Sequence, residues 1–162
     1  MVPATGLTPG RESGNVAARE ARVNLDSPYT RLALSTVLGA AIGWERTLDR
    51  KPAGLRTYAV VSLGSAVFMI AAGPGTTDAS RVLQGIVTGI GFLGAGSILR
   101  ANGTIRGLTS AATTWLAAGL GALTGLGKYA LAIYLTVLTL VILRGLMWLE
   151  MRWRPADRAP KA

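Results

Sequence analysis

The 162-residue chain contains no cysteine and no histidine. The absence of cysteine excludes disulfides, thiol nucleophiles and thiolate metal sites, and the absence of histidine excludes imidazole as a base or a ligand. Any catalysis would depend on eight acidic residues and on Lys, Arg, Ser, Thr and Tyr side chains. Most general-base and nucleophile schemes use His or Cys, so we do not expect an enzyme.

Charged and aromatic residues are also scarce. Charged residues make up 15% of the chain, hydrophobic residues 50%, and the mean hydropathy is +0.40, whereas soluble domains carry about 25% charged residues. The net charge of +9 would suit a nucleic-acid-binding protein, but aromatic residues that could stack on bases are only 6%. The basic residues lie mostly between apolar runs, as they do at the ends of membrane spans. The composition favours a membrane protein, and no nucleic-acid partner is expected.

Five apolar segments follow a polar N-terminal stretch. Residues 1–28 are rich in Gly, Pro, Ala and Arg, without an apolar run of signal-peptide length, so we expect a flexible tail. A helix needs about 20 apolar residues to cross a bilayer, and the segments approach that length, although the first is short or continues beyond Glu45. We therefore expect an all-α membrane protein, with a bundle of five transmembrane helices in residues 29–150 and a basic cytoplasmic tail at 151–162. The segments are 29–44, 55–73, 80–99, 107–127 and 128–149.

Two other architectures fit the pattern poorly. A membrane-spanning β-barrel needs strands in which apolar and polar residues alternate, and these segments do not alternate. A soluble helical bundle needs a polar face on each helix, and segments that are apolar all round would leave none.

The basic residues between the segments predict the orientation in the membrane. They gather between the first and second segments, between the third and fourth, and after the fifth, and they are nearly absent from the other two connections. We therefore expect the N-terminus outside and the C-terminus inside. Arg11, Arg19 and Arg22 argue for the opposite orientation, but they have less weight because acidic residues accompany them.

The third segment contains GIGFLGAG at residues 89–96, which includes the G-x-G-x-x-G pattern of dinucleotide-binding loops. That fingerprint must follow a strand, open a helix and precede an acidic residue by about 20 positions. Here the glycines lie within an apolar run, and no Asp or Glu occurs between Asp78 and Glu150. The context therefore argues against a nucleotide site.

The same glycines have two other interpretations. On a helix that turns about 100° per residue, Gly85, Gly89 and Gly96 share one face, whereas Gly91 and Gly94 lie on another. Small residues allow close helix packing in lipid, so we expect a tightly packed third helix and a homo-oligomer. The alternative is a kinked or unwound helix that exposes backbone to an ion, since each glycine disfavours a helix interior by about 1 kcal/mol.

Glycines four residues apart recur in other segments, at Gly39 and Gly43 and at Gly121 and Gly125. They extend the prediction of close helix packing to the first and fourth segments.

Charged residues at the segment ends are the candidate functional residues. Glu45 and Arg46 end the first segment, and Arg56 lies near the start of the second, so Glu45 has Arg46 and Arg56 as potential partners. Charge close to hydrocarbon is costly and is often retained for function. The alternative is that these residues only anchor helix ends and set the topology.

Asp78 and Arg81 begin the third segment. Asp78 suits a helix N-cap, and the alternative is a cation contact, because Mg²⁺ takes one or two carboxylates together with water. Asp78 and Glu45 are thus the candidate metal ligands. The topology separates them by about 30 Å, so we expect no two-carboxylate Mg²⁺ cage and no other cofactor.

Polar and aromatic residues of the fourth segment are candidates for helix packing or for a pore. The hydroxyl groups of Thr109 and its neighbours can bond to their own helix or to another helix, and the alternative is a polar path. Trp115 is expected to pack or to lie at the membrane interface. Arg144, late in the fifth segment, is expected to extend toward the basic C-terminal tail.

Several of these motifs occur together in one order. They are GAAIGWER at 39–46, AGLRT at 53–57, the Asp78 and Arg81 pair, GIGFLGAGSILR at 89–100 and RGLTSAATTW at 106–115. Over about residues 30–150, this set resembles the MgtC/SapB family of bacterial membrane proteins.

The resemblance implies a multi-pass domain of five helices in the bacterial inner membrane, linked to magnesium homeostasis, low-magnesium adaptation and virulence. It transfers the family's charged positions to Glu45, Arg46, Arg56, Asp78 and Arg81. It transfers the glycine block to Gly89, Gly91, Gly94 and Gly96. Longer members carry a soluble cytoplasmic domain after the last helix, and the role of that domain is not transferred.

Two functions remain open. In the first, the protein modulates other inner-membrane proteins, such as transporters or the ATP synthase, with the lipid bilayer and a second copy of itself as further partners. In the second, it is a transporter or channel subunit for Mg²⁺ or another ion.

Overall fold

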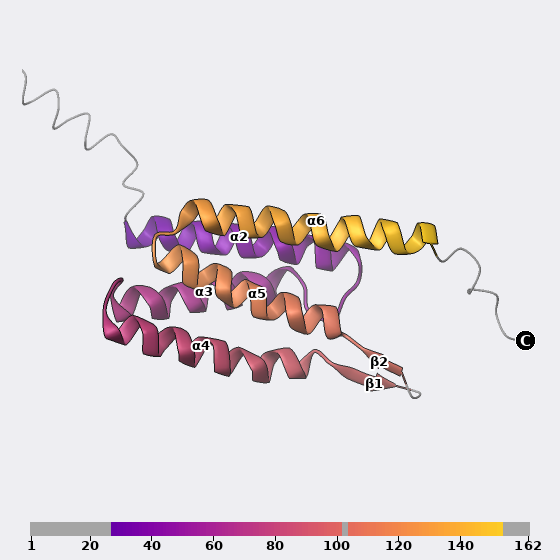
Figure 1. The fold of residues 1–162 in the computed structure, drawn as a ribbon, viewed down its shortest axis with the longest axis horizontal. Helices are drawn as coiled ribbons and strands as arrows, with labels where there is room; N and C mark the ends of the chain where they lie inside the picture. Colours follow the sequence, from indigo (N-terminus) through magenta and orange to yellow (C-terminus); the bar gives the residue numbers. More distant parts are fainter. Residues whose placement is uncertain (1–26, 102–103, 154–162) are drawn as a thin grey trace, which may run out of the picture.

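Each predicted apolar segment forms an α-helix in the computed structural model, which describes residues 27–101 and 104–153. The first helix continues beyond Glu45 to Leu48, which was one of the two alternatives for this short segment, and a proline at its first position suits its start. The predicted tails at residues 1–26 and 154–162 lie outside the described residues. The elements, shown in Figure 1, are α2 Pro28–Leu48, α3 Leu55–Ala72, α4 Thr77–Gly96, β1 Leu99–Ala101, β2 Thr104–Arg106, α5 Leu108–Gly125 and α6 Tyr129–Trp153.

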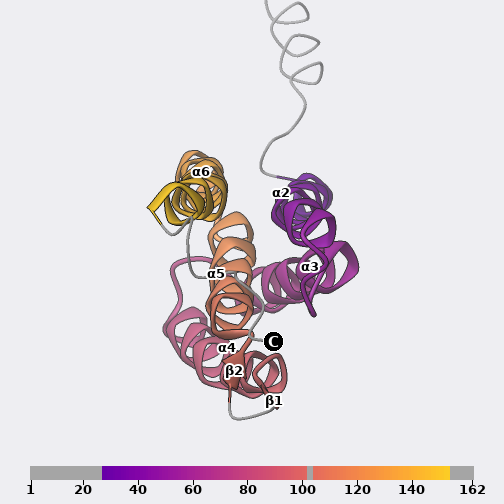
Figure 2. The same cartoon turned by 90° about the vertical axis from the view of Figure 1, so that its right-hand side faces the viewer.

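Helix α5 lies in the middle of the bundle and contacts the four other helices (Figure 2). Its buried positions are nearly all Gly, Ala, Ser or Thr, with Leu120 as the exception. Small side chains allow neighbouring helix backbones to approach from several sides, which explains why this sequence occupies the centre.

Helix α3 packs between α2 and α5 through the glycines of both neighbours. A Cβ atom at Gly39 would lie 2.6 Å from the Tyr58 carbonyl oxygen. At Gly121, a Cβ atom would overlap the carbonyl oxygen of Ser62. The hydroxyl groups of Ser35 and Ser62 also share a buried hydrogen bond of 2.9 Å between α2 and α3. The close packing predicted for the glycine pairs of the first and fourth segments is therefore confirmed.

The glycines of α4 differ from that prediction. The helix is continuous from Thr77 to Gly96, so the alternative of a broken third helix is wrong. Only Gly94 faces a neighbour, with Ala111 of α5 next to its Cβ position. For the remaining α4 glycines, a Cβ atom would meet nothing within 4 Å, because their faces point away from the bundle; they are Gly85, Gly89, Gly91 and Gly96.

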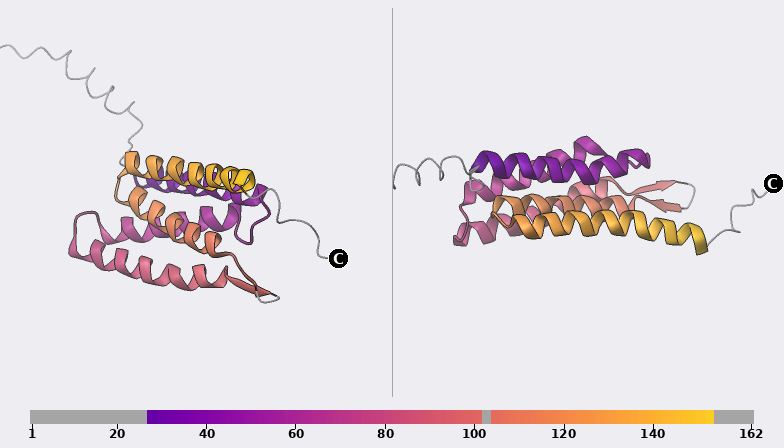
Figure 3. Two further views of the ribbon diagram at one scale, coloured as in Figure 1. Left: turned by 45° about the vertical axis from the view of Figure 1, so that its right-hand side comes forward. Right: turned by 90° about the horizontal axis from the view of Figure 1, so that it is seen from above.

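A short hairpin follows α4, where the sequence predicted helix up to residue 99. Strands β1 and β2 pair antiparallel, with Leu99 opposite Arg106. Gly107 then begins α5 in a left-handed conformation (φ 90°), and a side chain there would overlap the Ser97 carbonyl oxygen. Position 107 therefore requires glycine, because the backbone there is left-handed and passes close to Ser97. The hairpin and the C-terminal end of α6 lie at the same end of the bundle (Figures 1 and 3).

Two helical segments among the described residues are long and apolar enough to cross a membrane. They are Leu55–Ala72 in α3 and Tyr129–Leu149 in α6. Much of α6 points outward, with large exposed apolar side chains on several turns. These features are those of a helical membrane protein.

Candidate functional site

Glu45 lies at the centre of a charged cluster near the end of α2. Its side chain is only 5% exposed. One carboxylate oxygen lies 3.8 Å from Nη1 of Arg46, and the other lies 3.8 Å from Nε of Arg144 on α6. These separations exceed hydrogen-bond length, and neither oxygen has a hydrogen-bond partner among the described residues. Two guanidinium groups therefore hold the carboxylate by charge.

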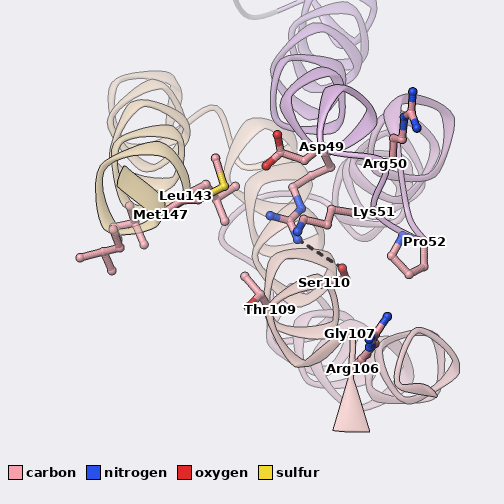
Figure 4. A pocket seen from close by; sticks show the side chains of 13 residues that line it. Asp49, Arg50, Lys51, Pro52, Arg106, Gly107, Thr109, Ser110, Leu143 and Met147 are labelled. Atoms are coloured by element: carbon pink, nitrogen blue, oxygen red, sulfur yellow. Dashed lines mark hydrogen bonds between the residues drawn. The ribbon is translucent and has the colours of Figure 1, made fainter. Parts of the chain in front are cut away.

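Arg46 connects this cluster to the central helix. It is 4% exposed, and its Nη2 donates to the Ser110 hydroxyl at 3.3 Å, the dashed line in Figure 4. The carbonyl oxygen of Ser110 accepts from the Tyr58 hydroxyl at 3.2 Å and from the Thr114 hydroxyl at 2.8 Å. Helices α2, α3, α5 and α6 are therefore joined at one charged and polar centre.

A cavity of about 660 Å³ adjoins this centre (Figure 4). The connection between α2 and α3 forms one side, and the junction of β2 with α5 forms another. The apolar residues Ile142, Leu143, Leu146 and Met147 of α6 complete the lining. The charged lining residues are Arg46, Arg50, Lys51 and Arg106, with Asp49 as the one acidic residue among them.

The local backbone explains how the basic loop is held at the cavity. The amide nitrogens of Arg50 and Lys51 donate to the carbonyl oxygens of Thr47 and Arg46, each at 3.0 Å, which ends α2. Arg50 adopts a left-handed conformation (φ 52°) at a position where glycine is common. The Thr47 hydroxyl accepts from the Leu55 amide at 2.8 Å and so fixes the loop to the start of α3.

The structure settles which residues pair with Glu45. Of the two arginines predicted from the sequence, Arg46 is a partner. Arg56 is exposed, and the second ion pair of Glu45 within the described residues is with Arg144 instead.

Asp78 and Arg81 lie at the opposite end of the bundle, on the exposed first turns of α4 (Figure 1). The prediction that Asp78 caps this helix is wrong, because the N-cap is Thr76, whose hydroxyl accepts from the Ala79 amide at 3.1 Å. Glu45 and Asp78 are separated as predicted. No group of three or more acidic side chains gathers within the described ranges.

The two candidates from the fourth segment have different surroundings. Thr109 lines the cavity beside Ser110. Trp115 is 50% exposed.

The sequence pattern did not indicate several members of the site. Tyr58 and Arg144 join it through contacts between distant segments, and no local motif marks them. Ser110 lies in the RGLTSAATTW motif, but that motif does not indicate its contact with Arg46. The basic loop residues were recognised only as indicators of orientation. The orientation predicted from the sequence was the available signal, since it expects Arg50, Lys51 and Arg106 at one end of the bundle.

Comparison with known proteins identifies the family. The model of the MgtC family matches residues 32–152. The "Putative magnesium transporter YhiD" of Escherichia coli K12 is 44% identical over 123 residues, which cover 70% of this chain and 57% of YhiD. The protein MgtC of Salmonella typhimurium LT2 is 45% identical over 115 residues, with 70% of this chain and 50% of MgtC covered.

A further relative is of more similar length. The protein SrpB of Synechococcus elongatus is 40% identical over 145 residues, which cover 76% of this chain and 80% of SrpB. The chain thus spans about half the length of its YhiD and MgtC relatives but most of SrpB. No solved structure matches the chain. The match over most of the five-helix region confirms the resemblance seen in the motifs, and the chain belongs to the MgtC family.

Proposed function

We propose that this chain is a bacterial inner-membrane protein of magnesium homeostasis that acts by modulating other membrane proteins. Its five helices span the membrane, with the N-terminus outside and the C-terminus inside. Family membership and the reference to magnesium in the name of YhiD support the link to this ion. The orientation is supported by Arg50, Lys51 and Arg106, which lie at the same end of the bundle as the C-terminus of α6.

The observation that carries the modulating role is the outward glycine face of α4. Gly85 and Gly89 line a groove of about 500 Å³ between α3 and α4, together with apolar residues such as Val60, Phe68 and Leu93. Packing against small residues drives helix association in lipid, where burial of apolar surface supplies little energy. The groove fits a transmembrane helix of another inner-membrane protein, such as a transporter or a subunit of the ATP synthase.

A bulky side chain in the groove tests this function. Gly89→Leu should leave the fold intact, because a Cβ atom there meets nothing within 4 Å, but the side chain would occupy the space for a partner helix. Gly145→Leu on α6 is the matched control, since its Cβ position is also open. The tagged chain should crosslink to magnesium transporters or ATP synthase subunits in cells grown at low magnesium. That capture should fall at least about tenfold for Gly89→Leu, the result of losing about 1.4 kcal/mol.

The result that opposes the proposal is equal capture of these partners by Gly89→Leu and Gly145→Leu. Crosslinks to a second copy alone would assign the groove to a homo-oligomer.

The second candidate function is ion transport, which the name of YhiD favours. The geometry of the site is less suitable for it. The Glu45 carboxylate already lies between two guanidinium groups, and a cation at that end of the bundle would meet a lining with four basic side chains. Purified protein in liposomes should therefore show no Mg²⁺ flux above that of empty liposomes. Flux that Asp78→Ala abolishes would establish the transporter instead.

A further inference from the structure

The cavity beside Arg46 has two chemically different sides. The connection between α2 and α3 and the end of β2 supply basic groups, from Arg50, Lys51 and Arg106. The α6 side chains that line the cavity are all apolar, namely Ile142, Leu143, Leu146 and Met147. A soluble anion would use the first side and leave the second unused. A molecule with an anionic head and an apolar chain would use both.

Two buried polar atoms of the lining, Nε of Arg46 and Oδ2 of Asp49, have no hydrogen-bond partner among the described residues. Arg46 is 4% exposed, and its Nη2 donates to Ser110. The side chain of Thr109 and the start of α5 also line the cavity, and Gly107 gives that helix no side-chain cap. Uncapped amides at a helix N-terminus attract anions, and an arginine with a free N–H group is suited to a phosphate oxygen.

The charges around the cavity remain basic when the neighbouring acidic residues are included. Asp49 lies in the lining, and Glu45, which is not a lining residue, forms an ion pair with Arg46. Arg144 offsets Glu45 from α6. Within the described part of the chain, no ion pair neutralises the exposed charged groups of Arg50, Lys51 and Arg106.

The cavity lies at headgroup depth along α6. Its apolar side belongs to the last turns of the apolar segment Tyr129–Leu149. The exposed Trp148 follows directly, and the guanidinium group of Arg152 lies 5.6 Å from the centre of its ring. Exposed Trp44 ends the apolar part of α2 at the same end of the bundle. Tryptophan and arginine at the ends of apolar helices mark the boundary between lipid and water.

We propose that this cavity binds an anionic phospholipid, with the phosphate at Arg46, Arg50, Lys51 and Arg106 and an acyl chain along the apolar side of α6. Basic pockets at the cytoplasmic ends of membrane helices recognise acidic headgroups in this way. The proposal concerns a different surface from the α3–α4 groove, so either one can fail without the other.

The test measures lipid binding to the purified full chain in detergent by native mass spectrometry. The probes are dioleoyl phosphatidylglycerol, dioleoyl phosphatidylcholine and inorganic phosphate. Phosphatidylglycerol should bind at least about tenfold more tightly than phosphatidylcholine, since each basic residue at a headgroup favours the anionic lipid. Equal binding of the two lipids would overturn the proposal. Binding of inorganic phosphate as tight as that of phosphatidylglycerol would assign the cavity to a soluble anion and overturn the lipid assignment.

Two variants locate the binding site without disturbing the fold. Arg50→Gly removes one charge and places glycine where the backbone is left-handed, so weaker binding cannot be attributed to a damaged loop. Lys51→Gln removes a second charge. Each should weaken phosphatidylglycerol binding about fivefold. Lys128→Gln, which changes an exposed lysine at the opposite end of α6, is the control and should bind normally. Equal binding by all these variants and the unmodified chain would overturn the proposal.

Discussion

At the scale of single residues, Glu45 is unusual because its charged side chain is buried without a hydrogen bond to any described residue. A buried carboxylate without hydrogen bonds is costly unless positive charge compensates it, and Arg46 and Arg144 provide that charge from two helices. Arg46 depends on the carboxylate in turn, because the other polar contact of its guanidinium group within the described residues is the hydrogen bond to the Ser110 hydroxyl. The pair thus forms a unit in which each charge is needed by the other.

Glu45→Gln should therefore lower stability while preserving shape. The variant leaves Arg46 buried without its counter-charge, and we expect a loss of about 1–3 kcal/mol in the free energy of unfolding. Denaturation of the purified protein in detergent, followed by circular dichroism, measures this loss. Asp78→Asn is the matched control, because that carboxylate is exposed and the change should stay within about 0.5 kcal/mol. Equal stability of the two variants would contradict the role assigned to Glu45.

At the scale of helices, close contacts between glycines and the backbone of a neighbouring helix determine how the helices pack. Helices α2 and α5 both present glycine to α3, whereas α4 presents most of its glycines outward. Glycines four residues apart therefore pack against a neighbouring helix in α2 and α5 but lie on an uncovered face in α4.

Gly121→Ala tests the packing of α5 against α3. The added methyl group would overlap the carbonyl oxygen of Ser62, and the helices must separate, at a cost of about 1–3 kcal/mol. Gly145→Ala makes the same change on α6, where nothing lies within 4 Å, and should raise stability by up to about 1 kcal/mol. Thermal unfolding of both variants in detergent measures the difference. An unchanged midpoint for Gly121→Ala would show that the two helices are not in close contact.

At the scale of the whole molecule, the two ends of the bundle differ in charge. The end with the hairpin and the C-terminus of α6 carries the basic cavity, whereas the opposite end carries Asp78, Arg81 and Lys128 on exposed turns. This asymmetry supports the proposed orientation and can be tested directly, because the chain contains no cysteine.

Single introduced cysteines should report the side on which each loop lies. In intact cells, an impermeant maleimide should label Pro74→Cys, in the exposed connection between α3 and α4, and should not label Lys51→Cys. Lys51→Cys should become labelled once the membrane is opened with detergent, which provides the internal control. The reverse pattern would invert the proposed topology.

The sequence predicted the helices well because long apolar segments between polar or basic connections have few structural alternatives to an α-helix. It also identified Glu45 and Arg46, whose charge next to an apolar segment is a local signal. It did not predict that α4 ends at Gly96 or that Thr76 caps it, since helix ends depend on a few hydrogen bonds.

Tertiary partners were the part that the sequence could not specify. Helical periodicity shows which glycines share a face, but it does not show whether a helix of the same chain covers that face, and none covers the Cβ positions of Gly85 and Gly89. Arg144 pairs with a carboxylate 99 positions earlier in the chain, which no local pattern encodes.

The position of α3 between two glycine-bearing helices also limits how this sequence can change over time. Ser62, Ser65 and Ala66 lie against neighbouring backbone, so any larger residue there requires a simultaneous change on α2 or α5. Val60, Val67 and Phe68 on the exposed side of the same helix face no such restriction from within the molecule. Among natural relatives, α3 should therefore vary on one side and remain nearly fixed on the other, and restriction on the exposed side would have to come from whatever binds it.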